Sequence, residues 1–427
     1  KLNAAQGSKI KRHGYTLLPD FASTAFMIKR ATLRAAIADC ADVCDAGGLS
    51  ELMTTYVILS RVKSANGLLL LRAFCANLFQ MGALPGPYCL LKLLRHRFEA
   101  SASGTSYNPS DSVNGYKAMM AEYEALVNGV TLWNVAIERQ IRVKGPDAVA
   151  FTNYVVTRDT SKIKVGRAKY TVVCNEQGGI LNDPVLLRIA EDEFWFSLAD
   201  SDLMLWLQGV NIGAGYDVVI DEIDVCPLQI QGPLSGEFMS RLFGDSVLDL
   251  PFYGLMETEL AGASVVVSQT GFTGEKGYEI FVRDSHIHAE RVWEHLLDEG
   301  KSVDLKVIST AHHRRIAAGI LSWGQDMDFE SSPFQVNLDY QVPRKKTVDY
   351  IGKAELERQR EVIESGDYPF KMKMVGLVFG GKPVTDYAPD FWLISGENGG
   401  EPVGFITSPW YHPEKKQNIA MGYVPFD

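Results

Sequence analysis

The chain has 427 residues, of which 46% are hydrophobic and 22% are charged, enough for two or three domains with sizeable cores. Its net charge of −10 argues against a nucleic-acid partner, because phosphate binding needs a basic face. The longest apolar run near the N-terminus, 68–71, is far shorter than the roughly 20 residues that a membrane span needs.

The six cysteines are few for this length, and they form no CxxC pair. Cys40 and Cys44 are four residues apart, but no His or Cys cluster lies near them, so no metal site is expected. We interpret all six as free thiols in a reducing compartment. This predicts a cytoplasmic protein, with an organelle left open as the alternative.

Residues 1–100 differ from the rest of the chain and are predicted to be an N-terminal extension of unknown role. The spacing of apolar residues is compatible with amphipathic helices over 27–45 and 68–80. The region is rich in Ala, Leu and Arg, but it carries several acidic residues and is too long for a transit peptide. A poorly specified extension and a mis-joined segment remain open, and no function is assigned here.

After a loop rich in Ser, Gly, Asn and Pro at 101–115, apolar spacing predicts a helix over 116–127. Asp147 is expected to cap a helix that runs to residue 154. Strands are predicted at 141–143, 169–174, 184–189, 193–198, 218–225, 228–230, 257–260 and 264–268, and further helices at 200–209, 235–243 and 287–299.

These elements predict an α+β fold without the regular β-α alternation of a doubly wound sheet. The chain has neither GxGxxG after a strand nor GxxxxGK[ST], so a nicotinamide or nucleoside-triphosphate enzyme is disfavoured. Strands at 374–378, 392–395, 404–407 and 419–424 predict a small all-β domain over 366–427. A closed barrel would need one or two more strands, so this domain is expected to be truncated.

The stretch 177–184 reads QGGILNDP and places Asn182 and Asp183 between two apolar runs. A carboxylate in this position is expected to be partly desolvated, which is typical of working sites. A hairpin turn, whose dihedrals Asn and Asp fit, is the simpler interpretation. Taken alone, the stretch favours the turn, and a functional role for Asp183 depends on a second stretch at 270–280.

Six segments together resemble the aminomethyltransferase family, whose founding member is the T-protein of the glycine cleavage system. The segments are LWNVAIERQIRVKGPDA (132–148), KYTVVCNEQGGILNDP (169–184), LQIQGPLS (228–235), QTGFTGEKGYEIFV (269–282), RRIAAGILSWGQD (314–326) and DYIGKAEL (349–356). NDP at 182–184, EFWFSLADSDLML at 193–205 and LSWGQD at 321–326 are similar to the dimethylsulfoniopropionate demethylase branch of that family.

The resemblance implies a three-domain ring of the T-protein type around a central opening that holds tetrahydrofolate. Residues 101–365 would form the folate-binding domains and 366–427 a small C-terminal β-barrel domain. No metal, corrinoid or flavin is implied.

The resemblance also implies roles for individual residues. Glu279 matches the glutamate that hydrogen-bonds the pterin ring, although a solvent-facing strand carboxylate is the commoner reading from composition. Asp183, with Asn182, matches the acidic step near the folate N5 and N10 atoms. Tyr170 and Phe272 would line the pterin slot, with plain core aromatics as the alternative.

One of two adjacent arginines, with Arg315 as our choice, would hold a carboxylate of folate or substrate; pairing of both arginines with surface acids is the alternative. Gln229 and Gln231, which flank Ile230 before Gly232, are weak candidates, with a turn as the alternative. The histidines at 286, 288, 312 and 313 form no HExxH motif or triad order and are expected at the surface.

Trp195 and Trp323 are the predicted substrate residues, because a sulfonium has no N–H to donate and is held by aromatic faces. Ser197 would share a strand face with Trp195 and could bond a substrate carboxylate. Departures from the family include Ala317 in place of Glu and Gln335 at the end of Ser-Pro-Phe-Gln. In addition, Tyr-Asn at 107–108 is followed by Pro109 where the demethylase branch has His.

The leading hypothesis is a tetrahydrofolate-dependent methyltransferase that demethylates a small-molecule sulfonium donor similar to dimethylsulfoniopropionate. It requires neither nucleic acid nor membrane as a partner. The second hypothesis is an aminomethyltransferase of the glycine cleavage type, which would take its group from a lipoyl carrier protein and make methylenetetrahydrofolate. The altered positions Ala317 and Gln335 motivate a third, a folate-binding protein without turnover.

Overall fold

The computed structural model describes residues 36–39, 68–72, 112–198, 202–385, 391–396 and 400–426. The chain divides into two compact units, Lys1–Pro87 and Tyr88–Asp427. In the first unit, strands β1 (Ala36–Asp39) and β2 (Leu68–Arg72) pair in parallel. The helices predicted over 27–45 and 68–80 are wrong at these residues, because short apolar runs fit strand and helix periods alike. The rest of both ranges lies outside the described residues, as does the tripeptide at 107–109.

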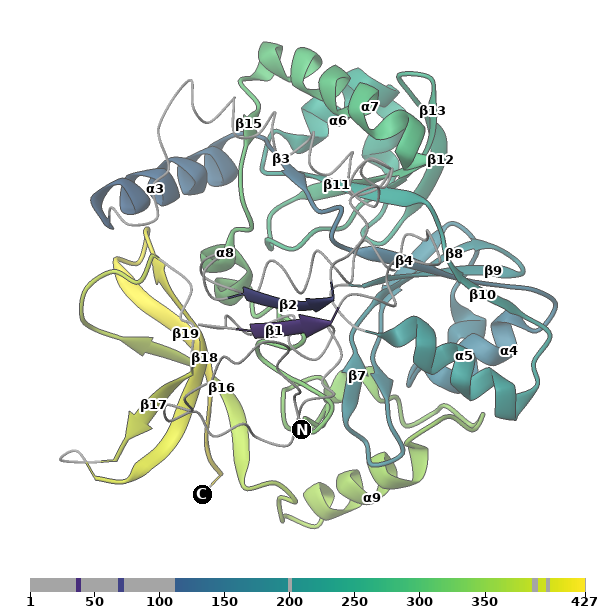
Figure 1. The fold of residues 1–427 in the computed structure, drawn as a ribbon, viewed down its shortest axis with the longest axis vertical. Helices are drawn as coiled ribbons and strands as arrows, with labels where there is room; N and C mark the ends of the chain where they lie inside the picture. The colour runs from purple at the N-terminus through teal and green to yellow at the C-terminus, as the bar shows by residue number, and fades with distance from the viewer. Residues whose placement is uncertain are drawn as a thin grey trace, which may run out of the picture. The chain divides into compact units, whose positions relative to one another are not determined.

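The first large sheet of the second unit has five antiparallel strands in the order β10-β4-β9-β8-β5. They are β4 (Arg139–Lys144), β5 (Arg167–Tyr170), β8 (Val185–Ala190), β9 (Glu193–Leu198) and β10 (Val219–Glu222). Helices α4 (Ala148–Val155) and α5 (Leu203–Ala214) lie together beside this sheet in Figure 1. Phe194, Phe196 and Leu207 fill the core between helices and sheet, because alternate residues of a strand point to one face.

The second large sheet has six strands in the order β12-β13-β14-β11-β3-β15. They are β3 (Thr131–Asn134), β11 (Val225–Gln231), β12 (Leu255–Leu260), β13 (Ala263–Ser268), β14 (Gly277–Arg283) and β15 (Lys306–Val307). Helices α6 (Ser235–Phe243) and α7 (Ser285–Gly300) cover one face, where Phe238, Trp293 and Ile280 are buried. Their apolar faces explain this placement, since an amphipathic helix buries one stripe.

The uncovered faces of the two sheets pack against each other through a thin apolar layer. Five buried side chains form this inter-sheet layer: Ala168, Leu187, Trp195, Val266 and Phe281. Strand alternation places Glu193 and Ser197 on the same face as Trp195, and Glu279 and Arg283 on the same face as Phe281. Polar side chains therefore lie at both ends of the layer, and one of these ends is the candidate site.

The C-terminal segment forms an open four-stranded antiparallel sheet in the order β16-β19-β18-β17. Its strands are β16 (Met372–Phe379), β17 (Trp392–Ser395), β18 (Pro402–His412) and β19 (Gln417–Pro425). The predicted C-terminal β-barrel is not confirmed, because no closed barrel occurs among the described residues and β16 and β17 are edge strands. Helices α8 (His312–Ala317) and α9 (Lys353–Glu364) were not predicted from the sequence.

Most other predicted elements in the second unit are confirmed, and β9, α6 and β17 match their predicted bounds. The helix predicted at 116–127 is α3 (Ser112–Asn128). The strand predicted at 169–174 is two pieces, β5 and β6 (Val173–Cys174), and β6 pairs with β7 (Ile180–Asn182). The remaining elements are the 3₁₀ turns η4 (Thr160–Lys162), η5 (Asp245–Asp249), η6 (Lys301–Val303) and η7 (Asp339–Gln341).

Asp147 precedes α4 as predicted, but its side chain makes no cap hydrogen bond to that helix. Its Oδ2 atom instead accepts the backbone N–H of Asp217 at 2.9 Å. The predicted cap is therefore wrong, because the carboxylate of Asp147 is hydrogen-bonded to the backbone of Asp217, just before β10.

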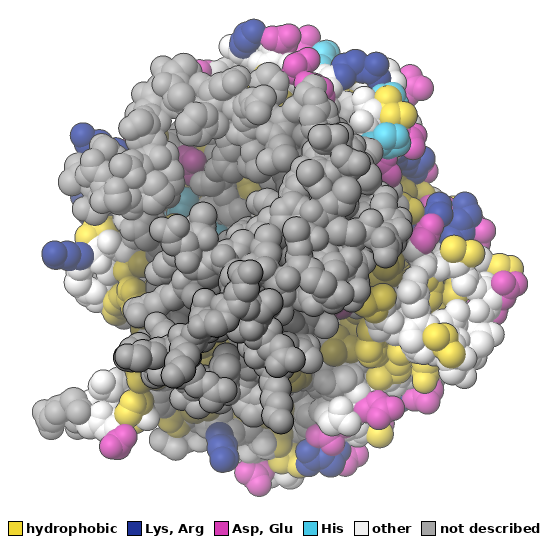
Figure 2. Space-filling model, in the orientation of Figure 1, with side chains coloured by type: hydrophobic (Ala, Val, Ile, Leu, Met, Phe, Trp, Pro, Cys, Tyr) yellow, Lys and Arg dark blue, Asp and Glu magenta, His cyan; other side chains and the backbone are white. Residues whose placement is uncertain are grey.

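The surface of the described residues mixes charges of both signs. On the face in Figure 2, basic and acidic side chains are interspersed, and hydrophobic side chains lie at the surface over α5, where Leu205 and Ile212 are exposed. Across the described ranges, none of the helices is both long enough and apolar enough to traverse a bilayer.

Lys346 fastens the end of α4 to the segment before α9, and its replacement is expected to destabilise the protein. The side chain is 4% exposed, and its ammonium donates to the carbonyls of Asn153, Val156 and Arg158. Burial lowers the pKa of Lys346 to about 7. Lys346→Met would leave three carbonyls without this donor, and we expect the free energy of unfolding to fall by about 2–4 kcal/mol.

Urea denaturation of the variant and the parent measures this difference. Lys345→Met is the matched control, because Lys345 is exposed next to Lys346 and its replacement should change stability by less than about 0.5 kcal/mol. Equal stability of the two variants would show that the hydrogen bonds of Lys346 do not stabilise the protein.

Candidate functional site

The first half of the candidate site is a hydrogen-bonded pair of side chains at neighbouring strand ends. Asp183 lies between β7 and β8, and Tyr170 ends β5, which pairs with β8. The Tyr170 hydroxyl donates to Asp183 Oδ2 at 2.8 Å. Burial raises the pKa of Asp183 to about 7, while the hydrogen bond from Tyr170 lowers it. Asp183 can therefore gain or lose a proton near neutral pH.

Asn182, the other half of the polar step, is the last residue of β7 and is 1% exposed. Trp323 lies close to this step, because its indole N–H donates to the carbonyl of Ile180 at 2.9 Å. The Trp323 ring is half-buried. The structure thus brings Trp323, Tyr170 and Asp183, three of the predicted site residues, into one neighbourhood.

Arg315 lies near this pair but is bound to other groups of the protein. Its Nη1 atom donates to Asp326 Oδ2 at 2.7 Å, and the two side chains are 1% and 0% exposed. Its Nη2 atom donates to Ser408 Oγ at 2.9 Å, and the Phe272 ring centre is 5.9 Å from the guanidinium carbon. The negative charge of Asp326 raises the pKa of Asp183, and the positive charge of Arg315 lowers it. Arg315 remains a predicted ligand residue, with most of its donors already used inside the protein.

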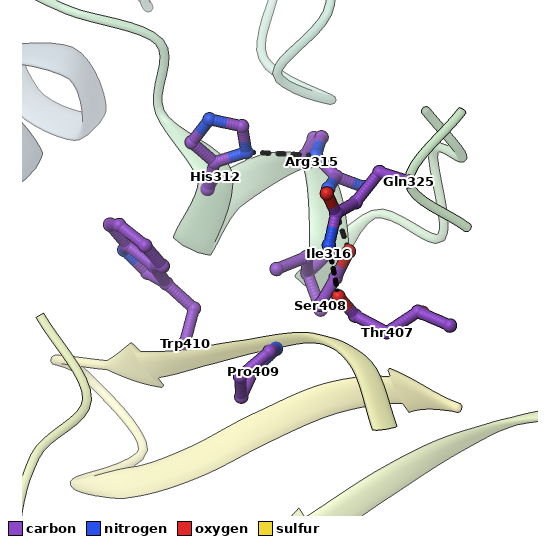
Figure 3. A pocket seen from close by; sticks show the side chains of 8 residues that line it. All are labelled: His312, Arg315, Ile316, Gln325, Thr407, Ser408, Pro409 and Trp410. Atoms are coloured by element: carbon purple, nitrogen blue, oxygen red, sulfur yellow. Dashed lines mark hydrogen bonds between the residues drawn. The ribbon is translucent and has the colours of Figure 1, made fainter. Parts of the chain in front are cut away.

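Figure 3 shows a small cavity beside Arg315, between α8 and β18. Its volume is about 10 Å³, which is close to the least that holds one water molecule. It is lined by the side chains of His312, Arg315, Gln325, Thr407, Ser408 and Trp410, among others. The cavity is too small for a pterin or for a small organic substrate.

The two histidines of α8 were predicted at the surface, and that prediction is wrong. His312 and His313 are 8% and 3% exposed, and their rings pack against Trp410 and Tyr123 with centroid distances of 5.4 and 5.2 Å. Burial lowers the pKa of each to about 3, so both are neutral at pH 7. The packing of α3 and β18 around α8, which the sequence does not reveal, causes the burial.

The second half of the candidate site is centred on Glu279 of β14, which is 6% exposed. Gln229 lies opposite it on β11 and donates to Glu279 Oε1 at 2.7 Å, and the Thr270 hydroxyl donates to Oε2. The reading of Gln229 and Gln231 as turn residues is wrong, because both lie in β11. Gln231 binds the loop before β14, donating to the Thr270 carbonyl at 3.1 Å.

A second carboxyl group, Glu138, is affected by the charge of Glu279 and was missed in the sequence. It lies between β3 and β4 and is half-buried. Ser197 donates to Glu138 Oε2 at 3.4 Å, and Gln140 Nε2 donates to Ser197 Oγ at 3.1 Å. Burial, and then the negative charge of Glu279, raise the pKa of Glu138 to about 8. These acidic surroundings disfavour a substrate carboxylate at Ser197, the role predicted for it.

We call Glu138, Gln140, Ser197, Gln229 and Glu279 the acidic cluster. It lies at the end of the inter-sheet layer nearest Asp183, because Ser197 pairs with Val185, two residues after Asp183. Burial, then the charges of Glu279 and Tyr340, raise the pKa of Tyr253 to about 12. Burial and then Asp183, followed by Tyr340 and Tyr253, raise the pKa of Tyr170. The backbone of Tyr253 links the two halves, because its carbonyl accepts the N–H of Ala168 in β5 at 2.8 Å and its N–H donates to the carbonyl of Gln269, next to Thr270, at 3.0 Å.

Trp195 lies in the middle of the inter-sheet layer and is 2% exposed. Its indole N–H donates to Glu193 Oε1 at 2.8 Å, and the Arg283 guanidinium lies 5.2 Å from its ring centre. A cation of the chain itself therefore covers one face of this predicted substrate residue. Beyond it, at the far end of the layer, is a groove of about 500 Å³ whose charged lining residues are Arg142, Glu193, Asp224, Glu257, Arg283 and Asp284.

Residues 98–346 match the GCVT N-terminal domain family. Over 320 residues the chain is 32% identical to dimethylsulfoniopropionate demethylase DmdA of Ruegeria pomeroyi, covering 75% of this chain and 84% of that protein. It is 28% identical over 318 residues to an aminomethyltransferase of Alkaliphilus metalliredigens, covering 72% and 82%. The glycine cleavage system aminomethyltransferase T of Bartonella henselae, 24% identical, has a similar fold, with a TM-score of 0.63 over 72% of this chain and 81% of that one.

Proposed function

We propose a function from one premise: the chain belongs to the GCVT family of the glycine cleavage T-protein, near the dimethylsulfoniopropionate demethylase branch. Its relatives transfer methyl or aminomethyl groups, and the protein is an enzyme of that kind. Our proposal is a tetrahydrofolate-dependent methyltransferase that demethylates a small sulfonium compound such as dimethylsulfoniopropionate. The products are a thioether acid, 5-methyltetrahydrofolate and one proton.

The observation that carries the proposal is the hydrogen-bonded pair of Tyr170 and Asp183, the single acid of the Asn-Asp step. When bound, tetrahydrofolate supplies the N5 amine that takes the methyl group. Transfer to a secondary amine releases one proton, and Asp183, whose pKa burial raises to about 7, is suited to accept it. Tyr170 holds the carboxylate in place through its 2.8 Å hydrogen bond. Asn182 contributes no second acid, which fits methyl transfer without an imine step.

The described residues fit a pterin at the acidic cluster. Glu279 is a buried carboxylate with acceptor capacity beyond the bonds from Gln229 and Thr270, and a carboxylate can accept two hydrogen bonds from an aminopyrimidinone edge. Trp323 offers an aromatic face near Asp183 for the sulfonium, a contact worth about 0.5–2 kcal/mol. A sulfonium methyl is already activated, so aligning the two reactants supplies most of the acceleration, roughly 7–11 kcal/mol.

The test is mass spectrometry of the folate after the full chain is incubated with tetrahydrofolate and dimethylsulfoniopropionate. Formation of 5-methyltetrahydrofolate, absent without enzyme, is the expected result. Folate that binds but remains unchanged would exclude this donor. The second candidate, aminomethyl transfer, is favoured by the likeness to the aminomethyltransferases and is tested by replacing the sulfonium with an aminomethyl-loaded lipoyl carrier protein.

Tyr170→Phe is expected to move the acidic limb of the pH profile of kcat/KM to higher pH. Asp183 acts as a carboxylate, so activity is lost as the pH falls through its pKa of about 7. The Tyr170 hydrogen bond lowers that pKa, so its removal raises the pKa and moves the loss upward. Tyr216→Phe is the control, since Tyr216 packs against Phe151 on the other face of the sheet. An acidic limb that stays in place in Tyr170→Phe would argue against Asp183 as the base.

A further inference from the structure

Two buried amide oxygens in the acidic cluster have no hydrogen-bond donor among the described residues. They are Oε1 of Gln140 and Oε1 of Gln229, and both side chains are 1% exposed. Both amide groups are held at the cluster by their nitrogens, which donate to Ser197 and Glu279. A buried acceptor without a donor costs about 1–3 kcal/mol. Two such atoms beside two carboxyl groups indicate a site for a ligand that brings N–H donors.

The two carboxyl groups of the cluster differ in their hydrogen bonds. Glu279 accepts bonds from Gln229 and Thr270, and both favour its charged form. Glu138 accepts one long bond, from Ser197, and faces the charge of Glu279. Burial and the charge of Glu279 raise the pKa of Glu138 to about 8, so Glu138 keeps a proton at neutral pH. The cluster then offers one O–H donor, on Glu138, beside three acceptors.

This set of groups matches one edge of a 2-amino-4-oxo-pteridine, which carries an amino group, a ring N–H and a carbonyl in that order. We propose that Glu138 is a ligand-binding residue that donates its carboxyl proton to the ring carbonyl, while Glu279 and Gln229 accept from the ring N–H and the amino group. The inference rests on the proposed function, since it takes folate as the ligand. It adds a second carboxyl group with the opposite hydrogen-bonding role to Glu279.

The pH dependence of binding follows from the groups around Glu138. Gln140 of β4, Ser197 of β9 and Gln229 of β11 are neutral, and the charge that acts on Glu138 from the described residues comes from Glu279 of β14. Arg139, next in the chain, is paired with Glu222 at 2.6 Å. When the pH rises above about 8, Glu138 loses its donor and places a negative charge beside the ring carbonyl. Affinity is therefore expected to fall with rising pH.

The experiment measures binding of 5-formyltetrahydrofolate to the full chain between pH 6.5 and 9.5 by titration calorimetry. For the parent protein, Kd is expected to rise about tenfold between pH 7 and pH 9, which corresponds to about 1.4 kcal/mol. Glu138→Gln keeps an N–H donor at every pH, so its Kd should stay nearly constant. Any titration of the ligand itself would appear in both proteins and is removed by the comparison. Glu259→Gln, an exposed change on β12, is the matched control and should follow the parent.

The outcomes separate this inference from the proposed function. A Kd that rises with pH in the parent and not in Glu138→Gln supports the role of Glu138. Binding with the same pH dependence in both proteins, or with none in the parent, overturns that role and leaves folate binding intact. If thermal denaturation shows that the parent protein is folded and it still does not bind the ligand, both the proposed function and the inference are overturned.

Discussion

Glu279→Gln is expected to weaken folate binding at least about 100-fold while the protein remains folded. The substitution places an amide NH₂ where the ligand also presents N–H groups, and it removes the charge from the remaining hydrogen bonds. Hydrogen bonds to a charged group contribute about 1.5–3 kcal/mol each, so the loss of two such bonds exceeds a factor of 100. Glu279→Ala should have at least the same effect. Titration calorimetry with 5-formyltetrahydrofolate measures the loss.

Stability controls this experiment, because Glu279 is buried and burial raises its pKa. A neutral side chain of the same size relieves the cost of a buried charge, so the Tm of Glu279→Gln at pH 8 should equal or exceed that of the parent. Glu259→Gln, exposed on β12, should change neither Kd nor Tm. Unchanged folate affinity in a folded Glu279→Gln protein would remove Glu279 from the site.

Asp326→Asn is expected to lower the free energy of unfolding by about 3–5 kcal/mol, the cost of leaving a buried charge without its partner. Asp326 is fully buried and accepts bonds from Arg315 at 2.7 Å, Thr407 at 2.7 Å and the backbone N–H of Ser322 at 2.9 Å. The amide would turn an N–H toward one of these donors. Urea denaturation, followed by the fluorescence of the tryptophans, measures the change.

An exposed ion pair of the same unit supplies the comparison for Asp326. Arg344 and Glu364 are bonded, with side chains 66% and 45% exposed, and Glu364→Gln should cost less than about 1 kcal/mol. Equal effects of the two substitutions would show that the Arg315–Asp326 pair does not act as a buried pair. A variant in which apolar residues replace both Arg315 and Asp326 should regain part of the stability lost in Asp326→Asn. Such a recovery would also indicate that the two residues act as a buried ion pair.

Strands were the part of the fold most open to prediction, because their side chains alternate along the chain. In β9, Phe194 and Phe196 alternate with Glu193, Trp195 and Ser197, and this pattern specifies both the strand and its two faces. The short apolar runs at 36–39 and 68–72 carry no such alternation, and the helices predicted there were wrong. The barrel was not confirmed because strand order, which decides closure, depends on contacts distant in sequence.

The candidate site could be predicted only where one segment carried its own signal. Asp183 stood out because it interrupts an apolar run, and Tyr170 proved to be its partner. Glu138 gave no signal, since a glutamate between two strands is ordinary for a turn. Its neighbour Glu279 lies on β14, about 140 residues further along the chain, so only the folded structure brings the two together.

The thin inter-sheet layer also separates two sets of charged side chains. It separates the acidic cluster from the groove that contains Arg142 and Arg283, and neither arginine is among the groups that shift the pKa of Glu138 or Glu279 within the described part of the chain. Dissolved ions screen exposed charges over about 10 Å at 0.1 M salt, but they do not enter a buried apolar layer. Charges are therefore not screened within the layer, and the two arginines act weakly on the acidic cluster because each is paired with a carboxylate, Asp221 at 2.6 Å and Glu257 at 2.7 Å.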